Sequence, residues 1–502
     1  MVVGLYIERL NKVVFILLSC LMLSACSSFL DEDPQDRFVI DDFYKNAGDA
    51  EAAVNAIYAQ LYEIYKRRMY LMADLPTDDH KNGKGMPNTQ LINLEYARFT
   101  ADNQFVREMW LYNYTGIMSA NAAIINIPGI VMDEELKNRL LAEAKFLRAL
   151  YYFNLVRFYG DVPLIKKLFT VNNIHVERIP KEEVYESIIE DLTFAGEKLP
   201  KTYDFTDVGR ATSGAAKILL AKVYLTIHEY GLAEAKIKEV VLKEGDYGYG
   251  LHDEYKANWK EDTELGKEMV FSIEYLSEGG ESNNQMALDG PKFSIHKGAG
   301  VPGLKSAKEA DIPSQELYNL FLEEDSRKHH TFKLEYESPN NGEIYQSFIP
   351  LFGKYWEDGQ IQLNKSSVNM HILRYADALL MYAEVLNEND NTADAIIYLN
   401  KVRQRAFQSE DYNYQNLSKD DLRLAIYKER RLELAHEGHR WFDLVRTNRF
   451  IERMREHGTI EAELAEEDKN DISQNIQDHM VLMPIPQYEI DLNPEVVQNP
   501  GY

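Results

Sequence analysis

A repeated pattern of small and apolar residues constrains the fold of this chain more than any other feature. Two stretches, starting at Leu220 and at Tyr382, place such residues at identical intervals. The matched positions are Leu220, Ala221, Tyr224, Ala233, Ile237 and Val240 in the first stretch, and Tyr382, Ala383, Leu386, Ala395, Leu399 and Val402 in the second. Apolar residues recurring three or four apart on both sides of a short break predict two helices joined by a turn. The paired alanines let the two helices of each pair approach closely.

The rest of the chain extends this helical character. The repeated pattern resembles the tetratricopeptide helix–turn–helix, whose units bury their apolar faces only by stacking on neighbours. Helical periodicity also marks residues 50–67, 110–127, 134–158, 181–199, 212–228, 370–386, 392–405, 419–435 and 440–456. We therefore predict a mainly α fold, in which tetratricopeptide-like helical pairs form a right-handed scaffold over about 38–242 and 370–457.

Residues 245–369 differ in character from this scaffold. Gly, Asn, Ser and Pro concentrate there, and short β-like runs occur at 268–276 and 344–348. Long irregular segments of compact proteins often carry function. We expect an irregular, loop-rich lobe with short β-strands, followed by a C-terminal segment at 458–502. Together with the scaffold it makes a single body over 38–502.

The N-terminus has the organisation of an export signal. Arg9 and Lys12 precede an apolar run at 13–23, and Ser24 and Ala25 lead into Cys26. A membrane-spanning helix needs roughly 20 apolar residues, so this run fits a signal peptide better. Leu-Ser-Ala-Cys at 23–26 also resembles the bacterial lipobox. We predict removal of residues 1–25, lipidation of Cys26 and an acidic tether at 26–37; an ordinary signal peptide with an unrelated cysteine is the alternative.

The composition of the chain excludes some classes of binding partner. The formal net charge is −26, which argues against nucleic acid and against adsorption to an anionic lipid surface. Membrane contact is therefore expected through the lipid anchor only. The other cysteine, Cys20, lies in the segment to be removed, so no internal disulfide is expected. The 32 tyrosines fit two explanations, helix packing and stacking surfaces for sugars.

The sequence contains no complete catalytic or metal-binding motif. His436-Glu437-Gly438-His439 approaches the zincin H-E-x-x-H, but the second histidine comes one position early and Arg440 takes its place. No phosphate-binding loop or dinucleotide fingerprint occurs. We predict no catalytic residue, metal or cofactor, although a pair of glycosidase carboxylates stays open in a chain with 81 acidic residues.

Two charged segments have alternative interpretations. Asp78-Asp79-His80 is either a solvated turn or a site for a ligand or calcium. Residues 428–446 combine many charges with apolar residues, which suggests a partly buried ionic network that fixes helix packing. Within it Arg430 and Glu433, and likewise Arg440 and Asp443, are three apart and can meet on one helix face.

Taken together, several long motifs resemble the SusD/RagB family of outer-membrane nutrient-binding lipoproteins of Bacteroidetes. They span residues 142–164, 374–386 with 399–406, 429–446, and 482–502. The resemblance implies a surface-exposed lipoprotein of the outer membrane that binds oligosaccharide or polysaccharide. It also implies delivery of that glycan to a TonB-dependent SusC-like transporter, without enzymatic activity.

The same resemblance places the ligand site in variable loops, where aromatic rings stack on sugars. Tyr275 and Trp356 are the predicted stacking surfaces, and the polar candidates are Asp79, His80, Asn82 and Asn284. Three other functions stay open: peptide capture within the same family, glycan hydrolysis, and a tetratricopeptide scaffold without a small ligand.

Overall fold

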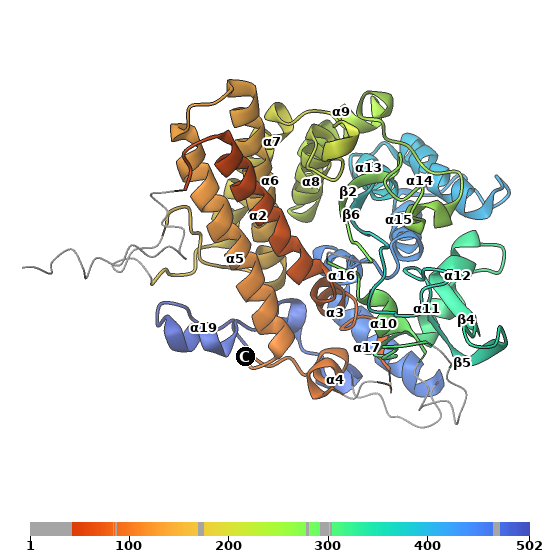
Figure 1. Cartoon of the computed structure of the whole chain (residues 1–502). Helices are drawn as coiled ribbons and strands as arrows, with labels where there is room; N and C mark the ends of the chain where they lie inside the picture. Colours follow the sequence, from red (N-terminus) through yellow and green to blue (C-terminus); the bar gives the residue numbers. More distant parts are fainter. Residues whose placement is uncertain are drawn as a thin grey trace, which may run out of the picture.

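Helices dominate the structure, which confirms the predicted fold class (Figure 1). The computed structural model describes residues 43–83, 85, 88–168, 175–277, 281–291, 301, 304–464 and 472–502. The predicted signal peptide, Cys26 and the tether lie outside the described residues. No helix in the described part of the chain has the length and hydropathy needed to cross a bilayer.

The N-terminal half is a layer of long helices packed side by side. Its helices are α2 (Ala47–Tyr65), α3 (Arg68–Ala73), α4 (Thr89–Glu95), α5 (Gln104–Asn126), α6 (Glu134–Tyr159), α7 (Lys181–Lys198), α8 (Ser213–Thr226) and α9 (Tyr230–Val241). Helix α6 contacts both α5 and α7, and α2 packs on α5 (Figure 1). At Gly116 the α5 backbone comes so close to Tyr151 on α6 that an added Cβ would lie 2.4 Å from its ring.

The repeated sequence pattern forms two helical pairs that pack against each other. The first pair is α8 with α9, and the second is α13 (Tyr375–Glu388) with α14 (Thr392–Phe407). Ala221, Ala233, Ala383 and Ala395 are all buried between their helices. Because α9 also contacts α13, the second pair stacks on the first, as tetratricopeptide units do. Helix α15 (Lys419–Glu433) then covers α13 and α14.

Two predicted helix boundaries are wrong. Met370–Arg374 is the buried strand β6, which pairs antiparallel with β2 (Met269–Ile273) before α13 begins. A short, fully buried apolar run has no periodicity that separates strand from helix. The helix expected at 440–456 is two helices, α16 (Arg440–Arg446) and α17 (Phe450–Leu464), because the chain turns at Asn448 with a φ of +55°.

The irregular lobe is built from short elements. They are the 3-10 turns η4 (Glu244–Tyr247) and η5 (Tyr255–Trp259), the helices α10 (Gln285–Asp289), α11 (Gln315–Leu320) and α12 (Ser326–Thr331), and the strands β3 (Asp311–Pro313), β4 (Phe332–Glu337) and β5 (Ile344–Phe352). Strands β4 and β5 form a hairpin, and β3 pairs antiparallel with β1 (His80–Asn82). This last pairing joins the segment after α3 to the lobe.

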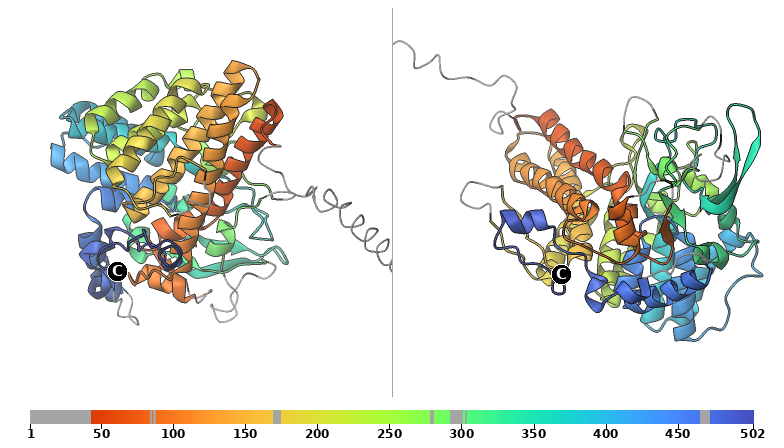
Figure 2. Two further views of the ribbon diagram at one scale, coloured as in Figure 1. Left: turned by 90° about the vertical axis from the view of Figure 1, so that its left-hand side faces the viewer. Right: turned by 90° about the horizontal axis from the view of Figure 1, so that it is seen from below.

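The C-terminal segment returns to the helical layer (Figure 2). It contains α18 (Ile472–Asn475), η6 (Asp478–Val481) and α19 (Gln487–Leu492). The Met483 N–H donates to the Phe158 carbonyl at 2.7 Å, and Asn499 Nδ2 donates to the Tyr159 carbonyl at 3.0 Å. The end of the chain is thereby fixed to the C-terminus of α6.

Candidate functional site

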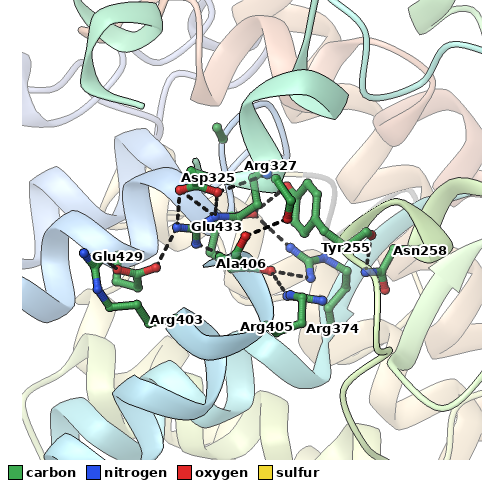
Figure 3. A network of polar contacts seen from close by, with 12 residues as sticks. Tyr255, Asn258, Asp325, Arg327, Arg374, Arg403, Arg405, Ala406, Glu429 and Glu433 are labelled. Carbon is green, nitrogen blue, oxygen red and sulfur yellow. Dashed lines mark hydrogen bonds and ion pairs between the residues drawn. The ribbon is translucent and has the colours of Figure 1, made fainter. Parts of the chain in front are cut away.

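A buried ionic layer joins the lobe to the scaffold (Figure 3). Arg327 comes from α12, Arg374 from β6 and Arg405 from α14, and all three converge on Glu433 at the end of α15. Arg374 also forms two 2.8 Å hydrogen bonds with Glu437, and Lys354, in the segment after β5, binds the same carboxylate. All of these side chains are buried.

The arginines determine the protonation of this layer. Burial alone would raise the pKa of Glu433, but Arg405, Arg374 and Arg327 outweigh it and lower the pKa to about 2. Glu433 is therefore ionised and paired at neutral pH. Such an arrangement fixes the packing of the lobe on the scaffold.

The network predicted at 428–446 is present, but its predicted pairs are wrong. Arg430 binds Asp377 at 2.8 Å and Asp443 at 2.9 Å, whereas Glu433 takes its partners from other elements. Arg440 binds Asp78 at 2.8 Å, not Asp443. A buried charge needs several fixed hydrogen bonds, and the neighbouring elements supply more of them than one flexible side chain three residues away.

The segment Asp78-Asp79-His80 is buried, so it is not a solvated turn. Asp78 accepts hydrogen bonds from Arg440 at 2.8 Å and from Arg453 at 2.6 Å. Arg431 binds Asp79 at 2.6 Å. Both carboxylates thus serve in helix packing and present no surface to a polymeric ligand.

His80 belongs to a buried cluster of two imidazoles and three carboxylates. Its Nδ1 lies 2.7 Å from Asp311 Oδ1, and His436 Nε2 lies 2.9 Å from Asp289 Oδ2. Asp74 lies beside His80, with its Oδ2 3.9 Å from Nε2. Burial raises the pKa of Asp74 to about 7, although His80 and the Gly438 N–H act in the opposite direction. His80 and His436 were each identified from the sequence, but their proximity in space was not predicted because the two positions are far apart in the chain.

Trp356 lies between two hollows of the irregular lobe. One, of about 420 Å³, is lined by Trp259, Lys260, Glu261, Asp262, Trp356, Glu357, Asp358, Ser367 and Val368. The other, of about 620 Å³, is lined by Leu304, Lys333, Glu335, Tyr336, Glu337, Ser338, Pro339, Ile344, Trp356, Asp358, Gly359, Gln360 and Ile361. Trp356 is half-buried and is the only aromatic residue common to both hollows. We call Trp356 with these two hollows the Trp356 site.

Neighbouring side chains hold Trp356 in place. The Tyr336 ring packs edge-on against it with centroids 4.9 Å apart, and Lys333 Nζ lies 4.9 Å from its ring centroid. The backbone N–H of Trp356 donates to the Gly353 carbonyl at 2.9 Å. The buried Tyr336 hydroxyl has no hydrogen-bond partner within the described residues. Lys333 and Tyr336 were not predicted from the sequence. Both lie on the same strand, β4, and this close spacing of a cation and an aromatic residue is the signal that could have indicated them.

The other predicted site residues lie elsewhere. Tyr275 is buried, with its ring edge-on to Tyr62 at 5.5 Å, so it offers no open stacking face in this structure. Asn284 precedes α10 and lines neither hollow of the Trp356 site. The Asn82 N–H donates to Glu95 at 3.1 Å. The structure therefore does not bring the six predicted residues together.

A third hollow, of about 630 Å³, lies between α5 and α19 on the helical layer. Leu111, Met118, Leu492 and Val496 are among its lining residues. Trp110 also lines it but is itself buried.

Comparison with known proteins places the chain in a family. A model described as "SusD family" matches residues 334–502, and one described as "Starch-binding associating with outer membrane" matches residues 28–225. SusD-like protein P2 of Formosa agariphila is 31% identical over 465 residues, covering 87% of this chain and 90% of that protein. The chain belongs to the SusD family.

Solved structures of SusD-like proteins share the fold. A protein described as a laminarin binding SusD-like protein is 30% identical, covers 91% of this chain with 100% of its own, and has a TM-score of 0.75. Surface glycan-binding protein A from Bacteroides thetaiotaomicron in complex with laminarihexaose has a TM-score of 0.74 over 90% of this chain and 99% of its own. Its 22% identity shows the fold alone.

Membership of the SusD family also answers the question of catalysis. The family consists of glycan-binding proteins that are not enzymes. The expected lack of enzymatic activity agrees with this membership. The family is associated with the outer membrane.

Proposed function

We propose that this chain captures oligosaccharide or polysaccharide at the cell surface and delivers it to a TonB-dependent SusC-like transporter. The observation that carries the proposal is the likeness to the laminarin binding SusD-like protein, which extends over 91% of the chain at 30% identity. Laminarin is accordingly the first glycan to test.

The Trp356 site is our proposed contact surface for the glycan. A half-buried indole held by Tyr336 and Lys333 supplies a rigid face for a sugar ring. Charged and polar side chains around it, including Glu335, Asp358 and Gln360, supply hydrogen-bond partners for hydroxyl groups. Of the six residues predicted from sequence, Trp356 is the one that combines an aromatic face with an adjoining hollow.

Location follows from the proposed anchor. Lipidation of Cys26 would hold the acidic body beside the membrane, and the acidic tether would leave it free to reach the transporter. Confinement to one membrane raises the effective concentration of binding protein and transporter without adding any contact between them. The anchor then takes no part in recognising the sugar.

Binding measurements test this proposal directly. The full chain would be titrated with laminarin, starch, xylan, mannan and pectin by isothermal titration calorimetry, and with peptides from a protein digest. We expect binding to at least one glycan. Binding to peptides with no binding to any glycan would favour the peptide-capturing alternative and refute our proposal.

Substitution of Trp356 locates the site. Removing a buried aromatic contact at an interface typically costs about 2 kcal/mol or more, so Trp356→Ala should weaken glycan binding at least about 10-fold. Phe348→Ala is the matched control, because Phe348 is an exposed aromatic on β5 that lines neither hollow. Equal affinity of wild type and Trp356→Ala would place the glycan elsewhere.

Partnership with the transporter needs a separate experiment. Detergent-solubilised outer membranes would be passed over a column that captures the tagged chain. Recovery of a TonB-dependent receptor together with the chain supports delivery; recovery of the chain without any such receptor, from cells growing on the bound glycan, would contradict it.

A further inference from the structure

Two buried imidazoles near the junction of lobe and scaffold each have one ring nitrogen without a hydrogen-bond partner in the described part of the chain. His80 Nε2 and His436 Nδ1 form no hydrogen bond with any residue that the structure describes. Both side chains are almost completely buried, at 1% exposure each. A buried polar atom without a partner is costly, and each such atom in a folded protein needs an explanation.

The opposite nitrogen of each ring contacts a carboxylate. Asp311 Oδ1 lies 2.7 Å from His80 Nδ1, and Asp289 Oδ2 lies 2.9 Å from His436 Nε2. Gln285 Nε2 donates to the other oxygen of Asp289 at 2.9 Å. An imidazole that donates one N–H to a carboxylate keeps a lone pair on its other nitrogen, and histidines that bind metals are held in this way.

A third side chain completes a set of donors. Asp74 Oδ2 lies 3.9 Å from His80 Nε2, and one ligand atom each from Asp74, His80 and His436 all lie within 4.8 Å of one another. Asp289, Asp311 and His436 also satisfy this criterion, but both of these aspartates already contact imidazole nitrogens. We therefore place them behind the histidines as supporting groups.

The charges of the cluster favour a cation. Asp74, Asp289 and Asp311 are three buried carboxylates, and within the described residues no Lys or Arg forms an ion pair with any of them. Buried charges are normally paired or bound to metal. Two imidazoles with a carboxylate suit a borderline metal such as zinc, whereas Ca²⁺ and Mg²⁺ prefer oxygen ligands alone.

We propose that Asp74, His80 and His436 bind a Zn²⁺ ion, supported by Asp289 and Asp311. Ligand atoms around tetrahedral Zn²⁺ are about 3.4 Å apart, so binding requires the three side chains to close by about an ångström. A water molecule or the second Asp74 oxygen would fill the fourth position. The ion would join the segment after α3 to the turn between α15 and α16. His436 belongs to the motif that fails as a zincin, and its partner comes from β1 instead of the same helix.

Titration of the full chain tests the site. The untagged protein would be stripped with chelator, dialysed and titrated with Zn²⁺ by isothermal titration calorimetry, with Ca²⁺ and Mg²⁺ as separate titrants. We expect one Zn²⁺ per chain and an isotherm that millimolar Ca²⁺ does not change. Absence of stoichiometric Zn²⁺ binding, or displacement of the ion by Ca²⁺, overturns the proposal.

Matched variants identify the ligands. His80→Gln and His436→Gln should abolish the 1:1 binding, and Asp289→Asn should weaken it about 10–100-fold, as loss of a supporting carboxylate does. His330→Gln is the control, because His330 is partly buried and likewise has a buried Nε2 without a hydrogen-bond partner in the described chain. Its charged neighbours are Lys256, Lys260 and Lys354, which disfavour a cation.

A measurement on the wild type covers the case in which these variants do not fold. The X-ray absorption spectrum of the zinc-loaded protein should show nitrogen and oxygen ligands near 2.0–2.2 Å with the multiple-scattering signature of two imidazoles. A spectrum without imidazole scattering overturns the proposal, as does 1:1 binding that persists in folded His80→Gln and His436→Gln proteins.

Discussion

Arg374 and Glu437 form a buried ion pair with two parallel hydrogen bonds: Nε lies 2.8 Å from Oε2, and Nη2 lies 2.8 Å from Oε1. Arg374 ends β6, and Glu437 lies in the turn between α15 and α16. Because both side chains are out of contact with water, each charge depends on this pair and on its neighbours Glu433 and Lys354 for its solvation. The pair links the strand that enters the second helical repeat to the turn beside the histidine cluster.

Glu437→Gln should therefore destabilise the protein strongly. Removing one partner of a buried ion pair leaves an uncompensated charge, which typically costs about 3–5 kcal/mol. The free energy of unfolding would be measured by urea denaturation at pH 7. Lys201→Met is the control, since its partner Asp246 is on the surface, and it should leave the unfolding curve unchanged. Similar curves for Glu437→Gln and wild type would refute the structural role of the pair.

His371 should make stability depend on pH. Burial, followed by Arg374, lowers the pKa of His371 to about 4 although its Nε2 contacts the Asn258 carbonyl. Between the unfolded value near 6.5 and this folded value, the unfolded chain binds one more proton than the native state. The contribution of His371 to the free energy of unfolding is therefore fully present above pH 6.5. It decreases by about 1.4 kcal/mol per pH unit as the pH falls toward 4.

His371→Gln removes this contribution. Urea denaturation of wild type and variant would be compared at intervals between pH 7.5 and 4. The difference at pH 7.5 gives the fixed cost of the substitution, and only its change with pH tests the prediction. We expect the wild type to lose stability more steeply than the variant; parallel curves would show that His371 does not titrate in this way.

Gly116→Ala and Gly231→Ala should shift stability in opposite directions. A Cβ at Gly116 would lie 2.4 Å from the Tyr151 ring, so the close approach of α5 and α6 must open, at a cost of about 1–3 kcal/mol. At Gly231 in α9 a Cβ meets no atom within 4 Å, and alanine should stabilise the helix by about 0.5–1 kcal/mol. Thermal unfolding compares them, and a common direction of change would contradict the predicted α5–α6 packing.

Cys26→Ser should release the chain from the membrane. The lipobox-like residues 23–26 predict acylation of the cysteine sulfur, and a serine cannot form the thioether. Labelling of cells with a fatty-acid analogue, followed by fractionation, should show label and membrane association in the wild type only. The Cys20→Ser chain is the control, because residue 20 lies in the predicted signal peptide. A labelled, membrane-bound Cys26→Ser protein would refute the anchor.

The sequence patterns predicted the helices well, because residues only three or four positions apart determine a helix and its packing face. Ala383 and Ala395 lie close in sequence and report one helical contact, so their spacing was sufficient. The prediction of a helix at Met370–Arg374 was wrong, because a buried run of five residues has no hydrophobic periodicity that separates a helix from a strand. The partners of Glu433 could not be predicted, since Arg327, Arg374 and Arg405 come from three separate elements.

The candidate site was harder to predict than the fold. Tyr275 and Trp356 are both aromatic residues of the irregular lobe, and no periodicity there separates a buried ring from a half-exposed one. Likewise, His80 meets Asp311 only because β1 and β3 pair, a contact between positions 231 residues apart. Residue type suggested the chemistry in both cases, but tertiary structure determined which side chains meet.

The buried ionic layer has a consequence for exchanging the irregular lobe between relatives. Arg327 and Lys354 belong to the lobe, whereas their partners Glu433 and Glu437 belong to the scaffold, so part of this ionic layer crosses the junction of the two parts. A chimera that receives a foreign segment lacking these two cations would lose the ion pairs that cross the junction and should be less stable. One that keeps both, while the loops around Trp356 vary, should fold and take on the donor's preference for a sugar. Keeping the ionic layer intact is thus the condition under which the binding specificity of this scaffold can be changed by exchanging loops.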